Sequence, residues 1–171
     1  GFTTNPSLIR KAGAKNYLEY CKKILKIVKK KPISFEVFAD DYKTIINQAL
    51  KIKKLGNNIY VKIPITNSKG LFLGKAIKHL NSREIKLNIT AVYASKQTEK
   101  ILKKINKKTK VIISIFAGRM ADAGKDPLPE LKKSISLGQK FKNVEILWAS
   151  TREPYNYLQS KQLGCHIITV P

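Results

Sequence analysis

Polar residues recur at a fixed interval along the chain, each near the end of an apolar run. The first four lie 26 residues apart and are Glu36, Lys62, Asn88 and Ser114. Ser150 follows after a further 36 residues. The runs alternate with helical patterns, as in residues 42–56 and 71–81. Strands that alternate with helices predict βαβ units and a parallel sheet, with one polar residue in each unit.

Seven short runs of apolar or β-branched residues are predicted to be strands. They cover residues 1–5, 32–39, 58–65, 86–93, 110–118, 144–150 and 166–171. A closed parallel barrel brings residues of like parity together at its carboxyl-terminal mouth, where active sites of this architecture lie. A flat doubly wound sheet does not converge them on one point, and no G-x-G-x-x-G follows the first strand. We therefore predict an α/β fold, a TIM (β/α)8-type barrel formed by a single domain over residues 1–171.

Composition excludes several classes of protein. The net charge is +23, but only four of the 34 basic residues are arginine. The lysines are spread through predicted helices, as in residues 21–31 and 99–110, where they form solvated faces. We predict no specific nucleic-acid site, and no membrane span because no stretch approaches 18 apolar residues. Cys21 and Cys165 lack metal-ligand spacing and are predicted to be unpaired thiols, so no metal site is expected.

Lys62 interrupts an otherwise apolar strand. The residues that alternate around it as a buried face are Ile59, Val61, Ile63 and Ile65. Burying an ammonium is costly unless it is paired or loses its proton. Desolvation can lower the pKa of a lysine from about 10.4, and a neutral amine attacks a carbonyl to form a Schiff base. Glu36 is the candidate acid/base; the alternative is a structural Lys62–Glu36 ion pair, but the convergence of other polar residues favours catalysis.

Two of the few arginines follow predicted strands at the same mouth. Arg119 and Arg152 are suited to bind phosphate oxygens bidentately, and Ser150 can donate a further hydrogen bond. The sequence therefore predicts a phosphate-binding end. The alternative is a pair of surface salt bridges, with Glu153 as a partner.

Six stretches together resemble the transaldolases, in their small bacterial branch. They are GFTTNPSLI, SFEVFADD, VKIPIT, NITAV, SIFAGRMADAG and WASTREPYN, in the family's order and spread over nearly all 171 residues. The resemblance implies a cytoplasmic class I aldolase-type barrel of the pentose phosphate pathway, without metal or organic cofactor. The implied reaction moves a dihydroxyacetone unit from fructose 6-phosphate or sedoheptulose 7-phosphate to an aldose phosphate. We expect sugar phosphates as partners and a homo-oligomer when the barrel is complete.

The resemblance also implies roles for individual residues. Lys62 matches the Schiff-base lysine, and Glu36 matches the glutamate that handles protons through a water positioned by Thr90. The residues implied to hold substrate are Asn5, Asn88, Ser114, Phe116, Arg119, Ser150 and Arg152. Of these, Arg119, Ser150 and Arg152 match the phosphate end. Fructose-6-phosphate aldolases carry glutamine and tyrosine where this chain has Glu36 and Phe116, so both positions are of the transferase kind.

One part of the family pattern is not matched. The family has an earlier strand with an aspartate that takes the proton from the ketose C4 hydroxyl, and Asp40 and Asp41 do not match it. We therefore expect an incomplete barrel with seven of eight strands, lacking the first strand and the C-terminal helices, as a fragment of a longer chain. Two alternatives to a transaldolase are an aldolase that releases dihydroxyacetone and an inactive basic barrel fragment that binds phosphate-rich partners.

Overall fold

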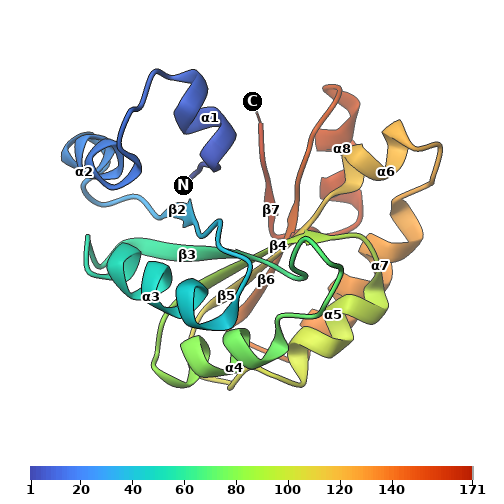
Figure 1. Ribbon diagram of the computed structural model, residues 1–171. Coiled ribbons are helices and arrows are strands. Elements are labelled where there is room, and N and C mark those ends of the chain that lie inside the picture. Colours follow the sequence, from blue (N-terminus) through green and yellow to red (C-terminus); the bar gives the residue numbers. More distant parts are fainter. Residues whose placement is uncertain (171) are drawn as a thin grey trace.

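Seven parallel strands lie side by side in chain order across the residues described by the computed structural model, which are 1–170 (Figure 1). They are β1 (Phe2–Thr3), β2 (Ile33–Glu36), β3 (Ile59–Pro64), β4 (Leu87–Val92), β5 (Val111–Ile115), β6 (Val144–Trp148) and β7 (Ile167–Ile168). Each neighbouring pair is parallel. Each predicted run contains one of these strands, so the predicted parallel topology is confirmed.

Helices connect the strands in the order that a βα repeat requires. They are α1 (Pro6–Lys11), α2 (Tyr17–Ile27), α3 (Tyr42–Lys53), α4 (Gly74–Ser82), α5 (Ser95–Leu102), α6 (Ala117–Asp122), α7 (Leu128–Gly138) and α8 (Tyr155–Gln162). Figure 1 shows α3, α4, α5 and α7 along one face of the sheet. The sequence of α3 explains its orientation, because Ile45, Ala49 and Ile52 fall on one helical face and are buried.

The strands divide their side chains between two apolar clusters. The main core lies between sheet and helices and takes alternate positions, such as Ile59, Val61 and Ile63 of β3. The opposite faces of the strands supply a smaller cluster, whose buried members are Tyr60, Ile112, Leu147 and Ala149. Parallel strands covered on both faces are expected to be apolar almost throughout, so a charged residue on one of them needs a specific partner.

The sheet is an open half-barrel within residues 1–170. β1 pairs only with β2 and β7 only with β6, so these two strands form the edges. Both edge strands are two residues long, and Phe2 of β1 is 55% exposed. The predicted fold, an incomplete TIM-type barrel with seven strands and a gap between the first and last, is confirmed.

A bulge in β4 changes which residues face the inside of the half-barrel. The register with β5 shifts between Ile89 and Val92, and Ala91 takes a φ of 58°. Val92 consequently packs in the main core with Leu87 and Ile89, although strict alternation would place it beside Asn88. Simple alternation along the strand therefore fails at residue 92, and the bulge is the reason.

Two compositional predictions are also tested by the structure. Among residues 1–170, no helix has the length and apolar character that crossing a membrane requires. Cys21 and Cys165 are both free thiols, as predicted.

Candidate functional site

Lys62 and Glu36 face each other across two neighbouring strands. They are direct partners in the β2–β3 register, and the Lys62 Nζ lies 3.2 Å from the Glu36 Oε2. Lys62 is only 8% exposed, and its Nζ also donates a hydrogen bond of 3.1 Å to the main-chain oxygen of Thr4. The buried ammonium thus has a carboxylate and a carbonyl as partners. This ion pair is common to the catalytic hypothesis and to its structural alternative.

Asn88 continues the polar row on β4. It is the direct β3–β4 partner of Lys62, which follows from the 26-residue repeat. Its Nδ2 donates to the Ser34 Oγ at 3.0 Å, and its Oδ1 accepts from the Ser114 Oγ at 2.7 Å. All three side chains are buried, so this chain of hydrogen bonds fixes the rotamer of each. Ser34 was not among the predicted site residues, although it shares the parity of Glu36.

Thr90 lies one step beyond this row toward the carboxyl end of the sheet. It pairs in register with Pro64, two residues after the lysine. Its hydroxyl is buried and has no hydrogen-bond partner among the residues that the structure describes. Buried hydroxyls are normally satisfied, so the Thr90 Oγ1 is suited to hold a water or a substrate oxygen.

Tyr17 of α2 fixes the main chain at Glu36. Its hydroxyl accepts from the Glu36 N–H at 2.8 Å and donates to the Glu36 carbonyl at 2.9 Å. Burial, together with the charges of Cys21 and Glu36, raises the pKa of Tyr17 above its ordinary value of 10.0, so the hydroxyl stays protonated at neutral pH. No periodicity in the sequence indicates this contact, because it joins a helix to a strand 19 residues later.

Asn5 serves a different purpose from the other predicted residues. It is the N-cap of α1, and its Oδ1 accepts the hydrogen bond of the Leu8 N–H at 2.8 Å. Its side-chain oxygen therefore gives one lone pair to the helix, and the amide nitrogen can donate to a ligand. The neighbouring Thr4 reaches the site through its main chain, a contact that side-chain chemistry cannot predict.

The two arginines of the predicted phosphate end lie after β5 and β6. The Arg152 guanidinium binds the Asp122 carboxylate, with Nε 3.0 Å from Oδ1 and Nη2 2.5 Å from Oδ2. This hydrogen-bonded pair lowers the pKa of Asp122 and raises that of Arg152. Asp122 lies in the quoted stretch SIFAGRMADAG but was not predicted as the partner; the sequence pointed to Glu153 instead. The Arg119 guanidinium lies 5.0 Å from the centre of the Phe116 ring, a cation–π contact.

Close packing joins the start of α6 to the loop after β6. A Cβ on Gly118 would lie 1.6 Å from the main-chain oxygen of Ser150, so only glycine fits there. Ser150 itself has a φ of 66°, which is uncommon for a residue with a side chain. This contact holds the segments of Arg119 and Arg152 against each other. Phe116 packs edge-on against Tyr93, with ring centres 5.7 Å apart.

The aspartates that follow β2 serve the local structure. Asp40 accepts from the Ser68 N–H at 2.8 Å and from its hydroxyl, and Asp41 caps α3 through the Thr44 N–H at 2.9 Å. Among residues 1–170, no three His, Cys, Asp or Glu side chains gather in a group that could hold a metal ion. The chemistry available at the carboxyl end of the sheet is that of the Lys62 amine beside the Glu36 carboxylate.

Comparisons with known proteins show the family from sequence and the fold from solved structures. The model of the transaldolase/fructose-6-phosphate aldolase family matches residues 1–171. A probable transaldolase of Thermoanaerobacter sp. (strain X514) is 37% identical over 172 residues, covering all of this chain and 75% of that relative. A probable transaldolase of Clostridium kluyveri is 38% identical over 173 residues with the same coverage. Among solved structures, a mandelate oxidase mutant superposes with a TM-score of 0.63 at 10% identity, over 87% of this chain and 50% of that one.

Proposed function

Because the chain belongs to the transaldolase/fructose-6-phosphate aldolase family, we propose that it acts as a transaldolase through a Schiff base on Lys62. The reaction transfers a dihydroxyacetone unit from a ketose phosphate to an aldose phosphate, within the pentose phosphate pathway of the cytoplasm. The observation that carries this proposal is the convergence of further buried polar side chains on the Lys62–Glu36 pair, since Asn88 is the direct strand partner of Lys62 and accepts a hydrogen bond from Ser114.

Each step of the proposed reaction uses a group at this pair. The Lys62 amine, once it has given up its proton, adds to the ketose carbonyl, and loss of water gives the iminium. Glu36 supplies and removes the protons of these steps through a water that the Thr90 hydroxyl positions. The iminium accepts the electron pair when the C3–C4 bond breaks, and the aldose phosphate leaves. The enamine then attacks the second aldehyde, whose oxygen takes up a proton, and hydrolysis of the resulting iminium releases the new ketose phosphate and the Lys62 amine. We assign no residue to removal of the C4 hydroxyl proton, because Asp40 and Asp41 are engaged elsewhere.

The remaining residues bind and select the substrate in this proposal. Asn88 and Ser114 hold hydroxyls of the dihydroxyacetone unit, with the amide nitrogen of Asn5 as a further donor. Arg119, Ser150 and Arg152 bind the phosphate, and Asp122 orients the Arg152 fork for that purpose. Phe116 offers no hydroxyl to protonate the enamine. The enamine therefore persists until a second aldehyde captures it, which favours transfer over release of dihydroxyacetone.

Borohydride trapping tests the nucleophile. We expect the protein incubated with fructose 6-phosphate and reductant to gain a reduced adduct on the peptide that contains Lys62. Lys62→Met should abolish this adduct, whereas Lys69→Met, a matched loss of an exposed lysine seven residues later, should retain it. Adduct formation at the original yield by Lys62→Met would refute the assignment.

Product analysis tests the type of reaction. Consumption of fructose 6-phosphate only when erythrose 4-phosphate is present supports transfer, and release of free dihydroxyacetone without an acceptor contradicts it.

The phosphate end is tested by Arg152→Ala. This variant should weaken binding of fructose 6-phosphate far more than binding of fructose, since a charge-assisted contact contributes about 1.5–3 kcal/mol. An equal loss for both sugars would assign Arg152 a structural role.

A further inference from the structure

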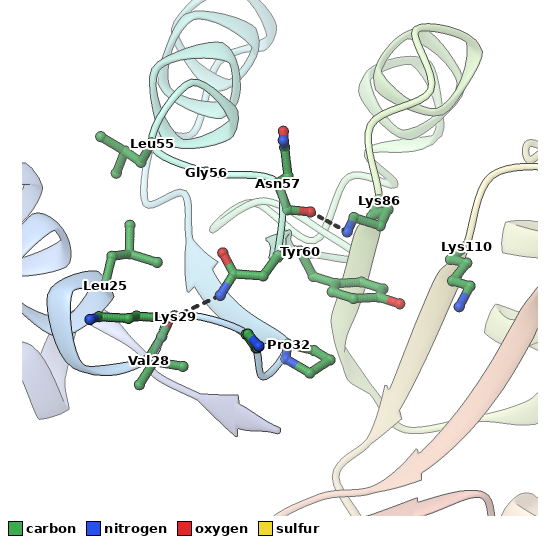
Figure 2. Close-up of a pocket in the computed structure, with 12 residues that line it drawn as sticks. Leu25, Val28, Lys29, Pro32, Leu55, Gly56, Asn57, Tyr60, Lys86 and Lys110 are labelled. Atoms are coloured by element: carbon green, nitrogen blue, oxygen red, sulfur yellow. Dashed lines mark hydrogen bonds between the residues drawn. The ribbon is translucent and has the colours of Figure 1, made fainter.

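A hollow lies at the amino ends of the strands, away from the carboxyl end of the sheet where Lys62 pairs with Glu36. It has a volume of about 770 Å³ and lies where β2, β3, β4 and β5 begin (Figure 2). Four lysines contribute to its lining, together with Tyr60 and other residues of the strand starts, and no aspartate or glutamate does. These lysines, called the hollow lysines below, are Lys29, Lys30, Lys86 and Lys110.

The parallel topology explains why these lysines meet. Lys29 and Lys30 lie in the connection from α2 to β2, while Lys86 and Lys110 come directly before β4 and β5. The amino ends of parallel strands gather at one edge of a sheet, so lysines that are up to 81 positions apart reach one hollow. The sequence suggested solvated helix faces, but none of these four lysines lies in a helix, since α2 ends at Ile27 and α5 at Leu102.

Lys86 is held in place inside the hollow. Its Nζ donates a hydrogen bond of 2.5 Å to the main-chain oxygen of Asn57, as Figure 2 shows, and lies 5.3 Å from the centre of the Tyr60 ring. Burial lowers the pKa of Lys86, and the charges of Lys53 and Lys110 lower it further. The Lys86 ammonium is partly removed from water and lies near the charges of Lys53 and Lys110, so an anion that enters the hollow stabilises it.

No side chain supplies that anion within the described residues. The ion pairs found in residues 1–170 join Lys62 to Glu36, Lys103 to Glu99 and Arg152 to Asp122, and none includes a hollow lysine. Burial, followed by the charge of Glu145, raises the pKa of Tyr60. Glu145 lines a different hollow beside Lys110 and forms no ion pair with it.

We propose that this hollow binds a small phosphate compound with several negative charges. A volume of this size falls in the range of small-molecule sites, about 300–1,000 Å³. Lysines act as point charges toward phosphate, and four of them around one concave surface suit adjacent phosphate groups better than a single one. The site is separate from the proposed active site, because none of the residues assigned to the reaction lines the hollow; Tyr60 lines both the hollow and the interior space of the half-barrel.

Calorimetric titration with tripolyphosphate at about 150 mM salt tests the proposal. Saturable binding at one site is expected, and Lys86→Gln and Lys110→Gln should each weaken it at least tenfold. Lys78→Gln and Lys100→Gln are matched controls, because they remove the same charge from exposed positions on α4 and α5 and should change the affinity less than twofold. Lys110 is exposed, so its variant preserves the fold even where Lys86→Gln does not.

Each other outcome overturns the proposal. Absence of saturable binding, or an equal loss in hollow and control variants, would show only a general effect of net charge. Tighter binding of a 20-nucleotide single strand, reduced alike by all four substitutions, would point to a nonspecific nucleic-acid surface.

Saturating fructose 6-phosphate should not displace tripolyphosphate, and Lys62→Met should bind it normally. Tripolyphosphate binding without borohydride trapping would therefore refute the transaldolase proposal alone, and the reverse result would refute this one alone.

Discussion

Removing the Tyr17 hydroxyl should destabilise the protein through the main chain of Glu36. β1 ends at Thr3, so it is too short to pair with the main chain of Glu36 on β2. The Tyr17 hydroxyl bonds the Glu36 N–H and C=O instead. Tyr17→Phe deletes both bonds, at 2.8 and 2.9 Å, but keeps the ring that packs edge-on against Phe38 at 5.4 Å. Leaving a main-chain donor and acceptor without partners costs about 1–3 kcal/mol. The Glu36 side chain is 17% exposed, so water can replace part of the loss and the lower half of that range is expected.

Urea unfolding followed by the fluorescence of Trp148, the single tryptophan and 1% exposed, measures this effect. The free energy of unfolding of Tyr17→Phe should fall by about 1–2 kcal/mol with an unchanged m-value. Tyr20→Phe is the matched control on the same helix and should stay within about 0.5 kcal/mol of the parent. Because Tyr17 positions Glu36, the rate of borohydride trapping should also fall in Tyr17→Phe. A Tyr17→Phe variant as stable as Tyr20→Phe would refute the reasoning.

Three further predictions follow from single contacts. Gly118→Ala should lower the free energy of unfolding by about 1–3 kcal/mol in urea, although alanine normally favours a helix, because its Cβ would lie 1.6 Å from the Ser150 oxygen. Asn88→Ala leaves two buried serine hydroxyls without their partner and should cost about 1–3 kcal/mol in the same assay. Burial raises the pKa of Cys21 from 9.0 to about 12, so a Cys165→Ala protein should react with Ellman's reagent at pH 8 only after urea is added. The raised value favours the neutral thiol, so its contribution to stability is lost as the pH rises from about 9 to 12.

The register of the site could be predicted because it depends on repetition. Strands joined by helices of similar length repeat at a constant interval, so residues 26 apart become direct partners, as Glu36, Lys62 and Asn88 do. Ser114 reaches the same row for a different reason. The partner of Asn88 on β5 is Ile112, and Ser114 lies two residues further along the same face.

The contacts that the sequence did not predict depend on conformation rather than on pattern. The bulge in β4 requires a positive φ at Ala91, which nothing in its side chain favours. The Asp122–Arg152 pair joins the end of α6 to the loop after β6, across 30 residues, and depends on how α6 packs, so the adjacent Glu153 was the simpler choice from sequence. The hollow lysines could not be told apart in the sequence from the other members of a set of 30 lysines. Only the strand order shows which lysines come together at the amino ends of the strands.

The double variant Lys62→Met/Glu36→Leu distinguishes a catalytic pair from a structural one. Breaking a buried ion pair leaves one charge without its partner and costs about 3–5 kcal/mol when burial is complete. Replacing both members with apolar residues of similar volume is often neutral or stabilising by about 1–4 kcal/mol. Here the side chains are 10% and 17% exposed, so Glu36→Leu alone should cost somewhat less than a fully buried break.

We therefore expect the double variant to unfold at a urea concentration no lower than that of the parent, while Glu36→Leu unfolds earlier and neither gives a borohydride adduct. That combination means that the ion pair is retained at a cost to stability, which a chemical role for the Lys62 amine explains. The contrary result is a double variant less stable than Glu36→Leu. It would show that the Lys62 contacts to Glu36 and to the Thr4 carbonyl are what hold β1 and β2 to β3, and the structural interpretation of the pair would then be the better one.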